Sequence, residues 1–364
     1  MVATVAAAGL VLSGCSVAEG LFSGSTEETE DATAAEEQAP AFQAEPGIAG
    51  TTTQPVEVSF TPVEESMQNR LLAPAVDLRI TEVAQTQTLS AAVYEDLTGE
   101  EAVIEAESMD EEDEPVETVA PAEGQVFLIA NYASDDPKWE PRGNEPDSEA
   151  SILIAGNEIA EAFSTDDGTM QRGTIVASVP AEASPDSAVL EVETDEAFQS
   201  LSLLDGSRVS SDVEHIYGVT GSTVEVVSAE EFEETFKTWV GDDARMAGSV
   251  VGGFLTPWMD SSDDGQGWAG TDQVYLAVDV DWAEIDASTA DRSSIYLQLP
   301  DETTVRPDNS PVDSNFEDDA VFRIPVDTED VTVVIEPEVE VIGGTSSNVD
   351  DWQPVEAELA IHAA

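Results

Sequence analysis

Basic residues are scarce in this chain of 364 residues, which has 11 Lys and Arg against 78 Asp and Glu and a formal net charge of −67. Nucleic-acid-binding proteins present Lys/Arg patches that neutralise phosphates, so this charge excludes that class. It also argues against direct docking on anionic lipid headgroups. Hydrophobic residues still make up 41% of the chain and gather in short stretches, unlike a wholly disordered chain. The charge therefore indicates folded domains with a surface suited to hydration or to high salt.

Cysteine and histidine are also nearly absent. The single cysteine, Cys15, excludes a disulfide framework. The two histidines, His215 and His362, are too few for a histidine-based zinc site. His215 lies near Ser and Asp residues, but in so acidic a chain this neighbourhood does not indicate a catalytic triad. The sequence has no HExxH, paired CxxC or phosphate-binding Gly-rich motif, so we predict no catalytic residues and no cofactor.

Carboxylates are the one abundant group that could bind a cation or catalyse a reaction. Residues 110–114 and 260–264 are rich in carboxylates. Calcium needs six to eight oxygens from a tight loop, and neither run has the EF-hand spacing. We therefore predict no dedicated metal site. Paired carboxylates can also hydrolyse glycosides, so a secreted carboxylate-dependent hydrolase is an alternative function.

No run of 18 apolar residues occurs, but the chain begins with a shorter run of apolar and small residues that ends in Leu12-Ser13-Gly14-Cys15. This motif resembles the lipobox of prokaryotic lipoproteins. The resemblance implies that residues 1–14 are a signal peptide, that the thiol of Cys15 carries a diacylglycerol, and that the amine is often acylated too. The chain departs from the pattern because no basic residue precedes the apolar run. The implied location is extracytoplasmic, with the protein anchored to the membrane through its N-terminal lipid.

Residues 15–72 are predicted to be an acidic, disordered tether. Residues 16–69 contain 11 acidic and no basic residues. Such a segment buries too little apolar area to offset the entropy of ordering it, and its charges keep it extended.

Short apolar runs rich in β-branched residues follow, and turn-forming residues separate them. This spacing is typical of a β-sandwich, so we predict a first sandwich domain over residues 73–222. Residues 95–123 hold 13 carboxylates and no cation, and are expected to form mostly a solvated loop within it. The predicted strands include residues 76–80, 125–129, 151–154, 173–180 and 188–192.

The series of runs then repeats, which indicates a tandem duplication. Residues 273–278 match 125–130, 294–297 match 151–154, and Ile324-Pro325 match Val179-Pro180, at offsets of 148, 143 and 145 residues. The repeat predicts a second β-sandwich over residues 245–364. The alternative is that sandwich strands resemble one another without duplication.

Residues 223–244 are predicted to be a linker helix between the copies. Ser228 and Glu231 form a capping box. One face of the helix would carry the apolar residues at i, i+4, i+7 and i+8, which are Phe232, Phe236, Trp239 and Val240. We favour a packing helix over a partner-binding one.

Three of these features together resemble the telokin-like, immunoglobulin-like domains of secreted bacterial lipoproteins. They are the Gln-Val-aromatic-Leu strands that begin at Gln125 and Gln273, the Ser-Ile strands, and the strands that end in Pro180 and Pro325. The resemblance covers each copy once. It implies an immunoglobulin-like β-sandwich fold and no shared catalytic site.

The second copy contains a candidate binding loop, where exposed aromatic residues would suit stacking on sugar rings or docking to a protein. Its residues are Trp258, Asp260, Asp263, Asp264 and Trp268. We thus predict a non-catalytic, lipid-anchored binding or structural module at the cell envelope, with a protein or a glycan as partner. The alternatives are the hydrolase and the substrate-binding lipoprotein of a transporter, which requires alternating strands and helices.

Overall fold

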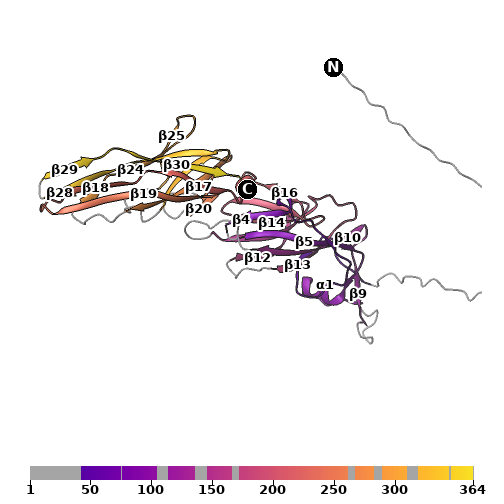
Figure 1. The fold of residues 1–364 in the computed structure, drawn as a ribbon. Coiled ribbons are helices and arrows are strands. Elements are labelled where there is room, and N and C mark those ends of the chain that lie inside the picture. Colours follow the sequence, from indigo (N-terminus) through magenta and orange to yellow (C-terminus); the bar gives the residue numbers. More distant parts are fainter. Residues whose placement is uncertain are drawn as a thin grey trace, which may run out of the picture. The chain divides into compact units, whose positions relative to one another are not determined.

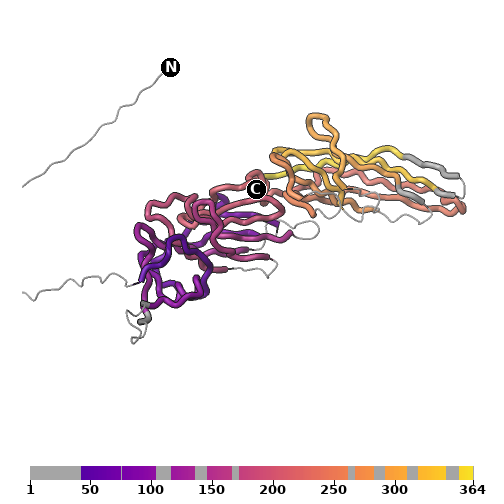
Figure 2. The backbone as a smooth tube through the Cα atoms, turned by 180° about the vertical axis from the view of Figure 1, so that it is seen from behind, coloured from indigo at the N-terminus to yellow at the C-terminus, as the bar shows by residue number. Residues whose placement is uncertain are grey.

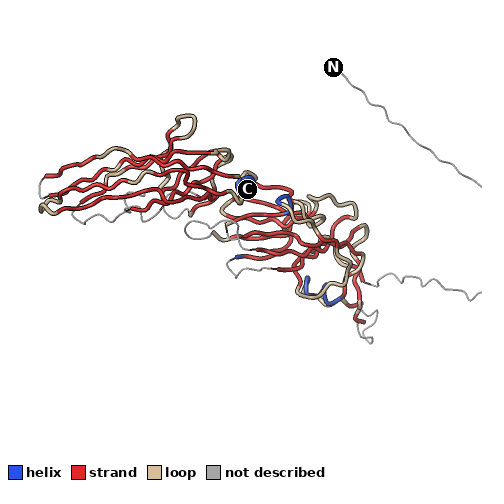
Figure 3. Tube along the Cα trace, viewed as in Figure 1, coloured by secondary structure: helices blue, strands red, loops and turns tan. Residues whose placement is uncertain are grey.

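The computed structural model describes residues 42–74, 76–104, 114–135, 146–165, 172–260, 267–282, 289–309, 319–343 and 346–363. Strands predominate in these residues, and the helices described there are short (Figure 3). The prediction of a mainly β chain is therefore confirmed. The helical segments are η1 (Met67–Asn69), α1 (Ala91–Thr98) and α2 (Ile216–Val219).

The first copy is built on two sheets that share one apolar core (Figure 1). Leu128, Ile152 and Leu190 lie in that core and are almost fully buried. Sheet I has the order β2-β13-β10-β5-β3, with β4 also paired to β5, and its strands are β2 (Ala49–Thr52), β13 (Arg172–Pro180), β10 (Gln125–Asp135), β5 (Val76–Thr86), β3 (Thr61–Pro62) and β4 (Arg70–Ala73). Sheet II consists, in spatial order, of β12 (Asn157–Ser164), β11 (Ser148–Ile154), β14 (Ala188–Thr194), β15 (Ala197–Ser202) and β16 (Arg208–Ser211).

Part of the outer face of sheet I is covered as well. Phe127 and Ile129 on that face pack in a second core with Val93 and Tyr94 of α1. Helix α1 begins at Ser90, whose side chain accepts a hydrogen bond from the backbone N–H of Val93, and ends at a left-handed Gly99. The covering layer also contains three short paired strands, β1 (Phe42–Gln43), β9 (Thr118–Ala120) and β6 (Leu89–Ser90); a separate pair is β7 (Val103–Ile104) and β8 (Glu114–Pro115).

The predicted tether is wrong from residue 42 onward. Strand β2 pairs with β13 and extends sheet I, and β4 is fully buried beside β5. In Figure 2 the indigo trace that follows residue 41 lies among the purple and magenta strands of the first copy. The apolar residues of this segment are sparse, but sheet I offers them a second apolar face, where they pack: Phe42, Ile48, Val56, Val58 and Phe60. The tether residues before 42, Cys15 included, lie outside the described residues.

The predicted acidic loop over residues 95–123 is also wrong in part. Its first residues belong to α1, and its last part contains β9, in which Val119 is fully buried. A few apolar positions are enough to hold these ends against sheet I, while the carboxylates described at the two ends are exposed. Residues 105–113 lie outside the described residues.

The second copy also has two sheets around one core, with Leu276, Phe322 and Val333 fully buried in it. Sheet III consists, in spatial order, of β18 (Phe232–Lys237), β19 (Asp243–Thr256), β22 (Gln273–Trp282) and β26 (Ala320–Pro325). Sheet IV consists of β17 (Thr223–Ala229), β30 (Val355–His362), β27 (Asp330–Glu336), β24 (Ser294–Gln298) and β25 (Thr304–Val305). The smaller strand groups are β20 (Trp258–Met259) with β21 (Gly267–Trp268), and β23 (Thr289–Asp291) with β28 (Glu338–Gly343) and β29 (Ser346–Asp351).

The strand order of the first copy recurs in the second. The order β5-β10-β13 in sheet I matches β19-β22-β26 in sheet III, and β11-β14-β15 in sheet II matches β24-β27-β30 in sheet IV. The register matches too, because Gln125 lies opposite Pro180 and Gln273 lies opposite Pro325. The same frame is thus built twice from the matched segments.

The predicted linker helix over 223–244 is wrong, because the segment forms β17, β18, the turn that follows and the start of β19. Residues four apart lie on one face of a strand as well as of a helix. Phe232 and Phe236 meet this condition and are both buried in the core of the second copy. Pairing of β18 with β19 decided between the two structures, and the second copy therefore begins before residue 245.

Candidate functional site

A buried ion pair lies where β4 and β5 form the edge of sheet I. The Arg70 guanidinium donates from Nε to Asp77 Oδ1 at 2.8 Å and from Nη2 to Asp77 Oδ2 at 2.9 Å. Asp77 is 0% exposed, and Arg70 is also buried. This two-pronged geometry matches a planar guanidinium to a planar carboxylate. The pair therefore fastens β4 to β5 in a place that water does not reach.

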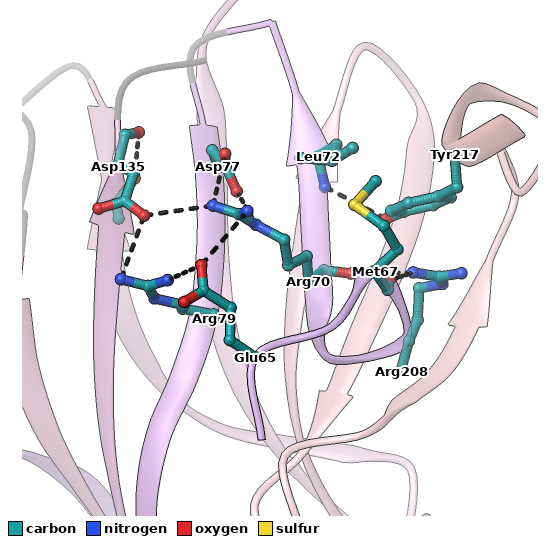
Figure 4. A network of polar contacts seen from close by, with 10 residues as sticks. Glu65, Met67, Arg70, Leu72, Asp77, Arg79, Asp135, Arg208 and Tyr217 are labelled. Atoms are coloured by element: carbon teal, nitrogen blue, oxygen red, sulfur yellow. Dashed lines mark hydrogen bonds and ion pairs between the residues drawn. The ribbon is translucent and has the colours of Figure 1, made fainter. Parts of the chain in front are cut away.

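Three further side chains extend this pair toward solvent (Figure 4). Asp135 on β10 accepts from Arg70 Nη2 at 3.2 Å and pairs with Arg79 Nη2 at 3.3 Å. Arg79 Nη1 also donates to Glu65 Oε1 at 2.6 Å. Asp135 and Glu65 are largely exposed, so the network passes from a buried end to an open one. Two guanidinium groups are here shared among three carboxylates.

A polar groove of about 820 Å³ crosses sheet I beside this network. Asn131 in its wall accepts from the Thr174 hydroxyl at 2.8 Å and donates to Glu82 at 3.0 Å. Arg172 on β13 is exposed, and no ion pair of its guanidinium is found in the described ranges. Hydroxyl, amide and guanidinium groups in one open groove suit a polar ligand rather than an apolar one.

A further arginine, Arg208 on β16, joins sheet II to η1 and β4. Arg208 forms a two-pronged pair with Glu214, at 2.6 and 3.0 Å, and donates from Nη1 to the carbonyl oxygens of Met67 and Arg70. Its guanidinium lies 3.4 Å from the ring centroid of Tyr217. Burial raises the pKa of Tyr217 to about 12, so the phenol stays protonated and serves as a hydrogen-bond donor. The role of these groups is to hold strands together.

The predicted binding loop is in part a buried contact between the two copies. Trp258 is 2% exposed, and its indole N–H donates to Asp195 Oδ2 at 2.9 Å. The indole N–H of Trp268 donates to the Thr194 carbonyl at 2.8 Å. Both acceptors belong to the turn between β14 and β15, where Asp195 and Glu196 have positive φ. The expected exposure is therefore wrong for Trp258, whose ring is used in packing.

Of the three acidic residues in that loop, Asp260 is described and half-buried, whereas Asp263 and Asp264 lie outside the described residues. Among the described residues no group of three or more His, Cys, Asp and Glu side chains is placed to hold a metal ion. No helix in the described part of the chain is long and apolar enough to cross a membrane.

Neither histidine makes a hydrogen bond to a serine, threonine or tyrosine hydroxyl within the described ranges. His215 precedes α2, and its buried Nε2 has no hydrogen-bond partner among the residues that the structure describes. Burial lowers the pKa of His215. The neighbouring Ser211 hydroxyl donates instead to Gln199 Oε1 at 3.0 Å. His362 lies 3.1 Å from Glu225 at an exposed position.

Comparison of the chain with protein-family models, with curated proteins and with solved structures found no match in any of the three.

The sequence analysis missed the arginine network and the groove. Their residues come from β2, β4, β5, β10, β13 and the loop that contains Glu65, and contacts such as Arg70 to Asp135 join residues 65 positions apart, so no local motif marks the whole set. One signal was available in the alternation of residues 76–80. Leu78 and Ile80 face the core, so the intervening Asp77 and Arg79 had to lie on the opposite face of the strand.

Proposed function

We propose that this chain is a non-catalytic, lipid-anchored extracytoplasmic protein that acts as a binding or structural module at the cell envelope. The observation that carries the proposal is that the two copies have the same strand order but different side-chain hydrogen bonds at equivalent positions. Ser178 in the first copy donates to Gln125 at 2.5 Å, whereas Arg323 at the equivalent position of the second copy donates to the Tyr275 hydroxyl at 2.9 Å. The repeat preserves packing and register but not a set of reactive groups, which favours a scaffold.

The anchor in this proposal is Cys15, acylated as the lipobox resemblance implies. Residues 16–41 then act as the spacer between the membrane and the first described strand. They number 26, with seven acidic residues and no basic one. A fully extended chain of this length reaches about 90 Å, which is enough to hold the folded part clear of a membrane surface.

The partner in this proposal is a protein, with a glycan as the other candidate. A glycan would lie in the polar groove on sheet I, where Thr174, Asn131 and Arg172 provide hydroxyl, amide and guanidinium groups. The immunoglobulin-like resemblance is consistent with either occupant, because such domains bind through their surfaces and loops.

Two alternatives receive less support. A hydrolase requires a carboxyl group with a raised pKa inside a cleft. Burial and the neighbouring carboxylate of Asp212 raise the pKa of Glu191, but Glu191 does not line the groove. A transporter's substrate-binding lipoprotein requires alternating strands and helices, whereas the described residues contain only two short α-helices.

Replacing Cys15 with alanine is expected to release the protein from the membrane. Two or more acyl chains, at about 0.8 kcal/mol for each buried methylene, give stable anchoring, and the variant has no acceptor for them. The measurement is membrane fractionation of cells that express the protein together with its signal peptide, with Ser16→Ala as the matched control. The control should stay in the membrane pellet. Equal retention of Cys15→Ala and the control would contradict the anchor.

A further inference from the structure

An exposed apolar pair forms the tip of the hairpin between β18 and β19, both labelled in Figure 1. Trp239 is 62% exposed and Val240 is 59% exposed. In the described part of the chain no large apolar side chain is more exposed than Trp239. The sequence predicts that both residues share a helix face with Phe232 and Phe236. In the structure Phe232 and Phe236 are buried in the core, whereas Trp239 and Val240 are exposed to solvent.

Three hydrogen bonds close the turn that carries the pair. Thr238 is only 6% exposed, and its backbone N–H donates to the Asp242 carbonyl at 2.9 Å. The Asp242 N–H donates to the Thr238 hydroxyl at 3.2 Å, and the Gly241 N–H donates to the Thr238 carbonyl at 2.9 Å. Gly241 has φ +91°, a conformation that suits glycine. These bonds define the backbone that carries the indole, and a turn already closed in this way loses less entropy on binding than an open loop would.

The hairpin below the tip is anchored in the core of the second copy. Phe232 packs against Trp282 with ring centroids 5.1 Å apart, and Phe236 packs against Trp352 at 6.1 Å. The two strands are joined at the last pair before the turn by an ion pair between Lys237 and Asp243 at 2.5 Å. The hairpin that carries the tip is therefore packed into the core of the second copy.

Acidic residues lie in the turn, at Asp242, and along the hairpin below it. Glu233 is paired with Arg245 at 2.8 Å, but no ion pair of Glu234 or Asp242 is found among the residues that the structure describes. The immediate surroundings are therefore negative, in a chain of net charge −67. An anionic membrane surface or a second copy of this chain would repel such a tip, whereas a basic protein surface would attract it.

We infer that Trp239 and Val240 are the docking tip for a second protein that presents an apolar pocket bordered by Lys and Arg. An exposed tryptophan that becomes buried in a pocket provides the large desolvated area typical of binding hot spots. The acidic rim would set the association rate and the choice of partner. The inference deepens the proposed binding function by naming the surface and the class of partner, and it does not depend on Cys15.

The test is retention of envelope proteins on the immobilised, detergent-solubilised full chain. Wild type is compared with the double variant Trp239→Ser/Val240→Ser and with Val227→Ser, which removes an equally exposed apolar side chain on β17. Wild type and Val227→Ser should retain the same basic protein, and the double variant should retain at least tenfold less of it. Retention should also fall as salt is raised from 0.05 to 0.5 M, because the acidic rim contributes.

Three results would overturn the inference: equal retention by all three proteins, no retained protein with wild type, or binding of wild type but not the double variant to pure phosphatidylcholine vesicles. The last result would assign the tip to a membrane. Circular dichroism of the double variant must match that of wild type, and its fractionation with the membrane should not change. Failure of the docking tip can therefore be told apart from failure of the lipid anchor.

Discussion

Replacing Arg70 with methionine is expected to lower the free energy of unfolding by about 3–5 kcal/mol, because it removes the guanidinium whose charge and two hydrogen bonds stabilise the buried Asp77 carboxylate. Asp135 and Glu65 would lose one contact each, but both are exposed and hydrated. The measurement is urea unfolding followed by circular dichroism. It reports on the first copy, since β4, β5 and β10 all belong to sheet I.

Two further variants make this prediction specific. Arg245→Met removes an exposed arginine from its pair with Glu233 and should change stability little. The double variant Arg70→Met/Asp77→Leu removes both buried charges, and should recover most of the lost stability because packed apolar groups often replace a buried ion pair without loss. The account of the network fails if Arg70→Met is no more destabilising than Arg245→Met.

The melting temperature is expected to rise by about 5–10 °C between 0.1 and 1 M KCl. The net charge of −67 produces repulsion that opposes the compact state. The Debye length falls from about 10 Å to about 3 Å over this range, so that repulsion between exposed carboxylates is largely removed. A gain of about 2–3 kcal/mol corresponds to this shift for a domain of the size of one copy.

Salt also weakens attractive ion pairs, which would lower the melting temperature. This loss is small for the Arg70–Asp77 pair, because buried pairs are screened much less than exposed ones. Sucrose at matched osmolality serves as the control, since it strengthens burial without screening charge. If KCl raises the melting temperature no more than sucrose does, the acidity is not a determinant of stability.

The repeated frame could be predicted from the sequence because its strands are short apolar runs in the same order. Gln125 and Gln273 begin matching strands, and Pro180 and Pro325 end their partners at the same register. These signals are local to each strand. Short apolar runs separated by turn residues are typical of a β-sandwich, so the pair of sheets in each copy could be predicted from them.

The errors arose where a local pattern fitted two structures. Phe232 and Phe236 are four residues apart and satisfy a helix face and a strand face equally. Only the pairing of β18 with β19, which forms beyond the local sequence, selects the strand. Likewise Phe42 and Val58 have no periodicity around them, and their burial depends on the outer face of sheet I, which the sequence does not mark.

In the candidate binding loop, the exposure expected of Trp258 is wrong, because its side chain is 2% exposed. Trp258 and Trp268 do lie together on β20 and β21. The turn at Thr194 and Asp195 accepts hydrogen bonds from both indoles, and that turn is more than 60 residues away in the chain. The local sequence gives no indication of such a long-range acceptor. Trp239, which is 62% exposed, was for its part predicted to pack, because it shares a helical spacing with Phe232 and Phe236.

The N-terminal peptide of the protein recovered from membranes tests the central claim, a lipid-anchored envelope module, most directly. After proteolysis, mass spectrometry should find a peptide that begins at Cys15 and carries a diacylglycerol on the thiol, with or without a further acyl chain on the amine. The contradicting result is a peptide that runs unbroken from Gly14 through Ser16 with an unmodified Cys15.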